Sequence, residues 1–130
     1  MPRPLNRILY IEDENDIRTV GCMALEMVGK FTVRACGIGE EAIAAFGAFG
    51  PDLILLDVMM PGMDGPATLG HIRKLPGGDS TPAIFMTAKV QPHEVAELKL
   101  LGALHVIPKP FDPMTLAASI REIWDAAGRQ

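Results

Sequence analysis

Short apolar runs that alternate with segments of helical periodicity constrain the fold of this chain more than any other feature. The most apolar run, 53–56, has four aliphatic residues in succession and follows a Pro-Asp pair. Such a run predicts a strand buried on both faces, which is typical of the centre of a parallel sheet. Four similar runs complete the set, so that strands are expected at 8–11, 32–36, 53–57, 82–87 and 104–107.

Between and after these runs, apolar residues recur at the spacing of an amphipathic helix. Asn15 is the predicted cap of the first helix and Gly29 its end. Asp112 is the predicted cap of a last helix that starts with Pro113. The other three helices are expected at about 40–49, from 64 to the Gly-Gly pair at 77–78, and at 92–101.

Strands that alternate with helices of about ten to fifteen residues imply right-handed βαβ units, a parallel sheet and helices on both of its faces. The sequence therefore predicts the α/β class. Its expected form is a flavodoxin-like doubly wound sheet of five strands, in the order 2-1-3-4-5, with five helices. The 130 residues are enough for one domain and leave no segment for a second, so we expect a single domain over residues 1–130.

Composition and charge argue against several classes of function. The net charge of −4 lacks the basic excess of a nucleic-acid-binding surface. No segment has the roughly 20 apolar residues that a membrane span requires, and no signal peptide is visible. The two cysteines, Cys22 and Cys36, lack the spacing of a redox motif or a metal site. We therefore expect a cytoplasmic location, without nucleic-acid or membrane partners.

Polar side chains gather where the predicted strands end. Glu12 and Asp13 follow the first strand, Asp57 ends the third, Thr87 ends the fourth, and Lys109 follows the fifth. The carboxyl ends of parallel strands meet at one edge of the sheet, and the first and third strands flank the point where the strand order reverses. Ligands of such sheets bind at this edge, so these residues form the candidate site.

Three carboxylates at one edge require a cation. Two of them ~4–5 Å apart repel by roughly 3–4 kcal/mol at an effective dielectric constant of about 20. Magnesium suits oxygen ligands and often takes one or two carboxylates plus a phosphate. Lys109 offers a point charge for a phosphate, and the Thr87 hydroxyl can donate to it. With no serine–histidine pair in view, a carboxylate is the available nucleophile, and its attack on phosphorus would form an acyl phosphate.

The order of these motifs is specific as a set. The motifs are Glu12-Asp13, Asp57 followed by Pro61 and Gly65, Thr87-Ala88, and Lys109-Pro110-Phe111. Together they resemble the receiver domain of two-component response regulators, over nearly the whole chain. The resemblance implies a signalling switch rather than a metabolic enzyme. In this switch, magnesium-dependent transfer of a phosphoryl group from a sensor histidine kinase or a phosphotransfer protein would phosphorylate Asp57.

The resemblance also implies a set of magnesium ligands. Asp13, Asp57 and the backbone carbonyl of Met59 would hold the ion together with Glu12. Asp13 ranks above Glu12 as a direct ligand, because in such sites one carboxylate often binds through water.

Two further residues carry the response in such domains. Lys109 would bind the phosphoryl group, Thr87 would swing toward it, and the peptide bond between Lys109 and Pro110 is expected to be cis. One position departs from the family: an aromatic residue usually stands three before the lysine, and here that residue is Val106. The chemistry at Asp57 should survive this change, but the aromatic half of the switch is missing.

Phosphorylation would alter the surface of the fourth helix, the fifth strand and the fifth helix, for an unknown downstream protein or a homodimer. Two alternatives remain. A degenerate receiver would only bind a partner, and the absence of an aromatic residue at Val106 is compatible with this alternative. The run from Gly37 to Ala42 imitates a dinucleotide-binding fingerprint. However, Glu40 and Glu41 would occupy the place of the pyrophosphate, which opposes that function.

Overall fold

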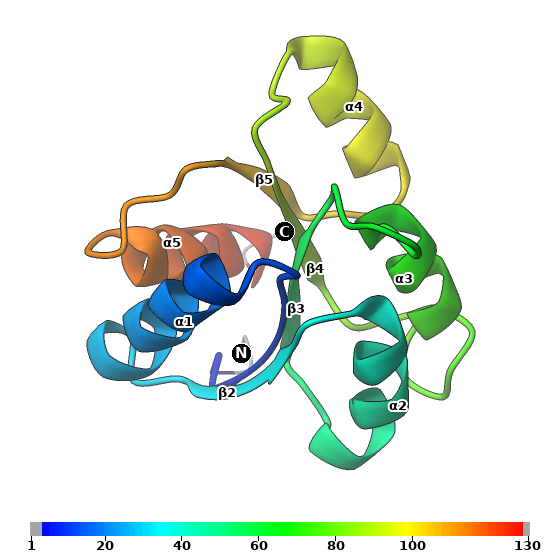
Figure 1. Ribbon diagram of the computed structural model, residues 1–130, viewed down its shortest axis with the longest axis horizontal. Coiled ribbons are helices and arrows are strands. Elements are labelled where there is room, and N and C mark those ends of the chain that lie inside the picture. The colour runs from blue at the N-terminus through cyan, green and yellow to red at the C-terminus, as the bar shows by residue number, and fades with distance from the viewer. Residues whose placement is uncertain (1–3, 129–130) are drawn as a thin grey trace.

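A parallel sheet of five strands forms the centre of the molecule (Figure 1). The computed structural model describes residues 4–128. Within them the strand order is β2-β1-β3-β4-β5, and all neighbouring strands are parallel. The strands are β1 (Arg7–Ile11), β2 (Thr32–Cys36), β3 (Leu53–Asp57), β4 (Ala83–Thr87) and β5 (His105–Pro108). The predicted fold class and strand order are therefore confirmed.

Helices cover both faces of the sheet. In Figure 1, α1 and α5 lie on one side of it and α2 and α3 on the other. The two hydrophobic clusters agree, because η1 and α5 share one of them and α2, α3 and α4 share the other. The helices are α1 (Asn15–Met23), η1 (Ala24–Val28), α2 (Gly39–Phe49), α3 (Gly65–Ile72), α4 (Pro92–Leu100) and α5 (Leu116–Gly128). Within the described residues, none of the helices combines the length and the apolar character needed to cross a membrane.

Successive residues of each strand contribute to different cores. In β1, Leu9 and Ile11 join the cluster under α2, α3 and α4, whereas Ile8 and Tyr10 join the one under η1 and α5. This division follows from the alternation of side chains along a strand. All five residues of β3 are buried, as predicted for the central strand. Asp57 is therefore fixed at the end of a strand that is buried along its whole length.

The predicted cap of the first helix is wrong by one residue. Glu14 is the N-cap, with extended backbone, and Asn15 is already helical. The Asn15 Oδ1 atom accepts a hydrogen bond from Arg18 Nη2 at 2.5 Å, so this side chain serves Arg18 rather than the helix N-terminus. The helix continues as η1, a π-helix in which Gly29 N donates to Ala24 O at 3.1 Å. It ends at Gly29 as predicted.

The last helix begins at Leu116, which is later than the predicted start at Pro113. Asp112 Oδ1 accepts a hydrogen bond from Met114 N at 2.8 Å, and its backbone oxygen accepts one from Thr115 N at 3.1 Å. Leu116 N also donates to Asp112 O at 3.0 Å, so the turn at Asp112 leads directly into the helix. The predicted cap residue thus accepts the first helical bond, although the helix itself begins at Leu116.

Candidate functional site

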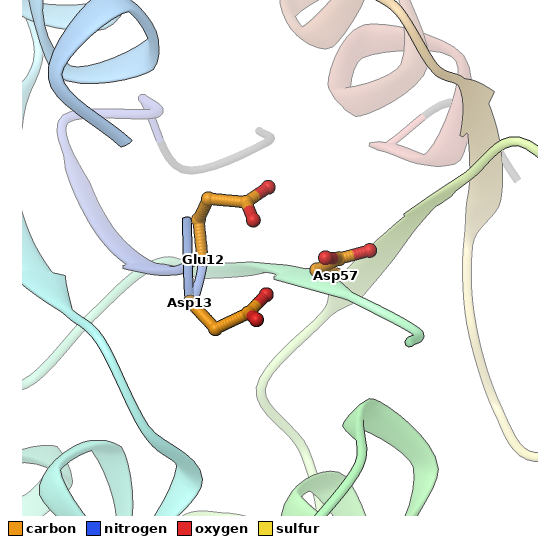
Figure 2. Close-up of side chains that lie close together, drawn as sticks. All are labelled: Glu12, Asp13 and Asp57. Atoms are coloured by element: carbon orange, nitrogen blue, oxygen red, sulfur yellow. The ribbon is translucent and has the colours of Figure 1, made fainter. Parts of the chain in front are cut away.

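Three carboxylates meet where β1 and β3 end. Glu12 and Asp13 directly follow β1, and Asp57 is the last residue of β3. One carboxylate oxygen of each residue lies within 4.8 Å of one from each of the other two. Figure 2 shows Glu12 and Asp13 with their carboxylates directed to the side where Asp57 lies. The register of β1 and β3 causes this convergence, because Ile11 pairs with Leu56 and so both strands end at the same level.

Lys109 supplies the positive charge of this cluster. Its Nζ atom donates to Glu12 Oε1 at 2.9 Å and to Asp57 Oδ2 at 3.1 Å. The lysine follows β5 directly, and its peptide bond with Pro110 is cis. Burial opposes the charged form, but the hydrogen bonds to Glu12 and Asp57 outweigh it and raise the pKa of Lys109. The side chain is therefore an ammonium ion that bridges two carboxylates.

Glu12 is held at several atoms. Its side chain is fully buried, and Lys109 donates to one carboxylate oxygen while Glu14 N donates to the other at 3.2 Å. Its backbone N–H donates to Cys36 O in the neighbouring strand at 3.0 Å. Burial raises the pKa of the Glu12 carboxyl, and the hydrogen bonds from Lys109 and Glu14 offset part of that rise. Glu12 is thus an internal partner of Lys109 as well as a member of the acidic cluster.

Asp13 differs from Glu12 in this respect. Its side chain is half-buried, and in the described part of the chain no hydrogen bond or ion pair engages its carboxylate. Its oxygens therefore remain available to a cation. Three carboxylates at this spacing form a hard oxygen donor set, which is the kind of site that Mg²⁺ occupies. The residues present fit that ion, and the half-buried Asp13 is more exposed than the buried Asp57 and Glu12.

Gly65 allows the start of α3 to lie directly against the loop that follows Asp57. Gly65 N donates to Val58 O at 3.0 Å, which draws the start of α3 against the end of β3. A Cβ atom on Gly65 would lie 3.0 Å from Val58 Cα and closer still to the carbonyl oxygen of Asp57. Met59, in the loop between them, has an exposed side chain.

Thr87 lies at the edge of the sheet with the acidic cluster, whereas Val106 lies in the hydrophobic core. Thr87 is the last residue of β4 and is buried, and its Oγ1 accepts a hydrogen bond from Lys89 N at 3.0 Å. Val106 is buried in the core cluster, where it pairs in register with Phe85. The valine therefore fills a core position, and it brings no aromatic group to the neighbourhood of Thr87.

Arg18 is a residue of this region that the sequence reading did not single out. Its Nη1 atom donates to the backbone oxygen of Glu12 at 2.7 Å, so a side chain from α1 holds the turn that carries the acidic pair. One signal in the sequence points to it, since Arg18 is the only basic residue between Arg7 and Lys30.

The glycines of the imitated dinucleotide fingerprint lie close to side chains of other elements. A Cβ atom on Gly37 would lie 3.1 Å from Arg18 Nη1, and one on Gly39 would lie 3.1 Å from Met63 Sδ. Side chains from other elements therefore occupy the space on the Cβ side of both glycines. Glu41 Oε1 accepts a hydrogen bond from Gly37 N at 3.4 Å, which places a negative charge at the same spot.

Comparison with known proteins gives a consistent result. A family model described as the response regulator receiver domain matches residues 8–121. The chain is 37% identical over 116 residues to the transcriptional regulatory protein CseB of Streptomyces avermitilis, covering 89% of the chain and 48% of that protein. It is 34% identical over 108 residues to the regulatory protein AtoC of Escherichia coli, covering 83% of the chain and 23% of that protein. The chain thus spans half or less of the length of these relatives.

Solved structures share the whole fold. The chemotaxis protein CheY4 of Vibrio cholerae has a TM-score of 0.84 and 28% identity, covering 92% of this chain and 99% of that one. A putative response regulator from Chloroflexus aurantiacus has a TM-score of 0.81 and 25% identity, covering 94% and 99%. Neither the family match nor these neighbours favours a dinucleotide-binding domain.

Proposed function

The chain belongs to the response regulator receiver domain family, and on this premise we propose that it is a signalling switch that accepts a phosphoryl group on Asp57. The observation that carries the proposal is the bridge of Lys109 between Glu12 and Asp57, inside a cluster of three carboxylates. An ammonium ion and an acidic cluster at the carboxyl edge of the sheet form a place where a cation and a phosphate can be held together.

The proposed reaction is transfer from a phosphohistidine of a sensor kinase or a phosphotransfer protein. An oxygen of Asp57 attacks phosphorus, the bond from phosphorus to the donor imidazole breaks, and the imidazole leaves with the electron pair and takes a proton. The product is an acyl phosphate on Asp57. We propose that the chemistry of the chain is limited to gaining and losing this group.

The side chains around Asp57 have separate tasks in this reaction. Asp13 and Asp57, with the backbone carbonyl of Met59 and with Glu12 through water, would hold magnesium. When bound, the ion supplies positive charge to the phosphoryl oxygens. Lys109 would exchange its bond with Asp57 for one with a phosphoryl oxygen, while its bond to Glu12 keeps the ammonium group in place.

We propose that Thr87 reports the new charge. The phosphoryl group adds about −1.5 to −2 charges, and the Thr87 hydroxyl can turn from its present bond with Lys89 N to donate to it. A shift from 1:99 to 99:1 between two states needs about 5.5 kcal/mol of differential binding. Because Val106 is aliphatic and buried, the response would pass through the backbone after β4 rather than through an aromatic side chain.

The proposed output surface comprises α4, β5 and α5. On α4, Leu100 is 86% exposed, and Leu101 beside it is 51% exposed, which offers apolar area to a downstream protein or a second copy of the chain.

CseB is named a transcriptional regulatory protein and AtoC a regulatory protein. We propose for this chain only the shared step, phosphorylation followed by a change of partner, without contact to nucleic acid by the domain itself. The two free cysteines accord with the cytoplasmic location that we propose.

Intact-mass measurement tests the proposal. The chain is incubated with magnesium and acetyl phosphate, and we expect a mass increase of one phosphoryl group. The adduct should be absent in Asp57→Asn and retained in Asp125→Asn, which changes an exposed carboxylate on α5. A wild-type chain that gains no phosphoryl group from acetyl phosphate or from phosphorylated histidine donors would support the degenerate receiver instead.

A further inference from the structure

We propose that Arg18 is a positioning residue that sets the cation affinity of the site by fixing the turn from Glu12 to Asn15. This inference rests on the proposed function, because it assumes that the carboxylates of this turn hold magnesium. Arg18 would act through its hydrogen bonds and not through its charge. The loss of these bonds and the loss of the charge have opposite effects on magnesium affinity.

The guanidinium of Arg18 joins both ends of the turn. Arg18 lies on α1 and reaches back toward the end of β1, where Nη1 donates to Glu12 O at 2.7 Å and lies 3.5 Å from Asp13 O. Nη2 donates to Asn15 Oδ1 at 2.5 Å. One rigid, planar group thus connects the residue before Asp13 to the first residue of α1.

The same guanidinium is enclosed from the side of β2. A Cβ atom on Gly37 would lie 3.1 Å from Arg18 Nη1, so the glycine leaves only the space that the arginine fills. Glu12 N donates to Cys36 O in the residue before this glycine. The turn with the acidic pair is therefore fastened to β2 by its backbone and to α1 by Arg18.

Arg18 does not neutralise the acidic cluster directly. Its hydrogen bonds go to backbone carbonyls and an amide oxygen. In the described residues, the ion pairs of the cluster join Lys109 to Glu12 and to Asp57 and do not include Arg18. The Asp13 carboxylate thus stays free for a cation, while the direction in which it points depends on the turn that Arg18 holds.

Two effects of Arg18 on cation binding have opposite signs. Its positive charge repels a cation, so removal of the charge alone would tighten magnesium binding. Its hydrogen bonds hold the ligands in place, and the loss of such supporting bonds typically weakens metal binding about 10- to 100-fold. We expect the second effect to be larger, because the half-buried Arg18 makes no ion pair with the carboxylates of the cluster among the described residues, whereas a displaced ligand is lost to the ion.

The experiment is a magnesium titration of the metal-free chain by calorimetry, with the dissociation constant as the readout. We expect Arg18→Ala to raise this constant about tenfold. Arg18→Lys keeps the charge but loses the two-armed donor, and we expect it to weaken binding as well. Arg34→Ala is the matched control, because it removes the same charge from an exposed side chain of β2; we expect it to leave the constant unchanged or to lower it slightly.

The outcomes separate the inference from the proposed function. If wild type binds magnesium and both Arg18 variants bind it equally or more tightly, the inference is wrong and the proposed site stands. If wild type binds no magnesium, the proposed cation site fails, and the inference fails with it. Circular dichroism checks the fold of each variant. If Arg18→Ala does not fold, Arg18→Lys decides, and wild-type affinity in that variant overturns the inference.

Discussion

Lys109 Nζ lies closer to Glu12 Oε1, at 2.9 Å, than to Asp57 Oδ2, at 3.1 Å. The Glu12 side chain is fully buried, so this lysine is the ammonium group that compensates its charge. The proposed phosphoacceptor therefore shares its cation with a carboxylate that does not react. In the absence of metal, the site is held together by this shared lysine.

Removal of the shared lysine should destabilise the metal-free chain. Lys109→Met leaves the charge of Glu12 buried without a partner, and we expect the free energy of unfolding to fall by about 2 kcal/mol, because the breaking of a buried ion pair costs roughly 3–5 kcal/mol and this one is partly open to water. Saturating magnesium should restore much of the loss, since it neutralises the same carboxylates. Urea unfolding with chelator or magnesium, followed by the fluorescence of Trp124, measures both values. Lys74→Met, at an exposed position, should show neither effect.

The Thr87 hydroxyl should be needed for the response but not for the chemistry. In Thr87→Ala we expect Asp57 to be phosphorylated still, but the switch equilibrium to shift back by about 2 kcal/mol, because a hydrogen bond to a charged group contributes roughly 1.5–3 kcal/mol. Amide hydrogen exchange in the segment after β4, with and without acetyl phosphate, reads out the switch. Thr87→Ser keeps the hydroxyl and should respond like wild type. A normal response in Thr87→Ala would remove the threonine from the mechanism.

A methyl group at position 65 should disturb the acceptor loop. The new Cβ in Gly65→Ala would lie 3.0 Å from Val58 Cα, and such overpacking costs typically about 1–3 kcal/mol. Because the backbone that moves belongs to Asp57 and Val58, the rate of phosphorylation by acetyl phosphate should fall together with stability. Gly70→Ala provides the comparison in the same helix, where nothing lies within 4 Å of the added atom. There we expect a gain of roughly 0.5–1 kcal/mol. Equal effects of the two substitutions would contradict this account.

The sequence was sufficient for the architecture and for the prediction that Asp13, Asp57 and Lys109 lie together at one edge of the sheet. The run from Leu53 to Leu56 can be satisfied only by burial on both faces, and that fixes β3 at the centre with Asp57 at its end. The predicted strand order then brings Asp13 and Lys109 close to Asp57, because parallel strands end at one edge of a sheet.

The hydrogen bonds within the site were not predictable in the same way. Periodicity locates a residue on an element but does not say which atoms it meets, so the bonds of Arg18 to the turn after β1 do not follow from the sequence. The side chain of Asn15 suits the predicted role of a cap, but its oxygen accepts a hydrogen bond from the guanidinium of Arg18 instead. The late start of α5 has a similar cause, because an aspartate cap fits a single turn as well as a helix.

The environment of the Tyr10 hydroxyl could not be predicted from the sequence either. Tyr10 is fully buried beneath α1 and, among the buried side chains that the structure describes, only its hydroxyl lacks a hydrogen-bond partner. A Cβ on Gly21 would collide with its ring, so the absence of a side chain there is what makes room for it. An unsatisfied buried hydroxyl costs about 1–3 kcal/mol. We therefore expect Tyr10→Phe to raise the free energy of unfolding by roughly 1 kcal/mol at neutral pH, measured by urea unfolding.

Alkaline pH should widen the difference between wild type and Tyr10→Phe. Burial, reinforced by the nearby Glu12 carboxylate, raises the pKa of Tyr10 well above its usual value. Above the unfolded-state pKa of about 10, the unfolded chain loses a proton that the folded chain keeps, so the free energy of unfolding falls as pH rises. Tyr10→Phe lacks this proton, so its free energy of unfolding should fall less steeply as the pH rises. Because Tyr10 is the only tyrosine, an absorbance titration of wild type provides a second test, in which its phenol should ionise only when the chain unfolds. Ionisation of the phenol in the folded chain near pH 10 would show that burial does not control this group.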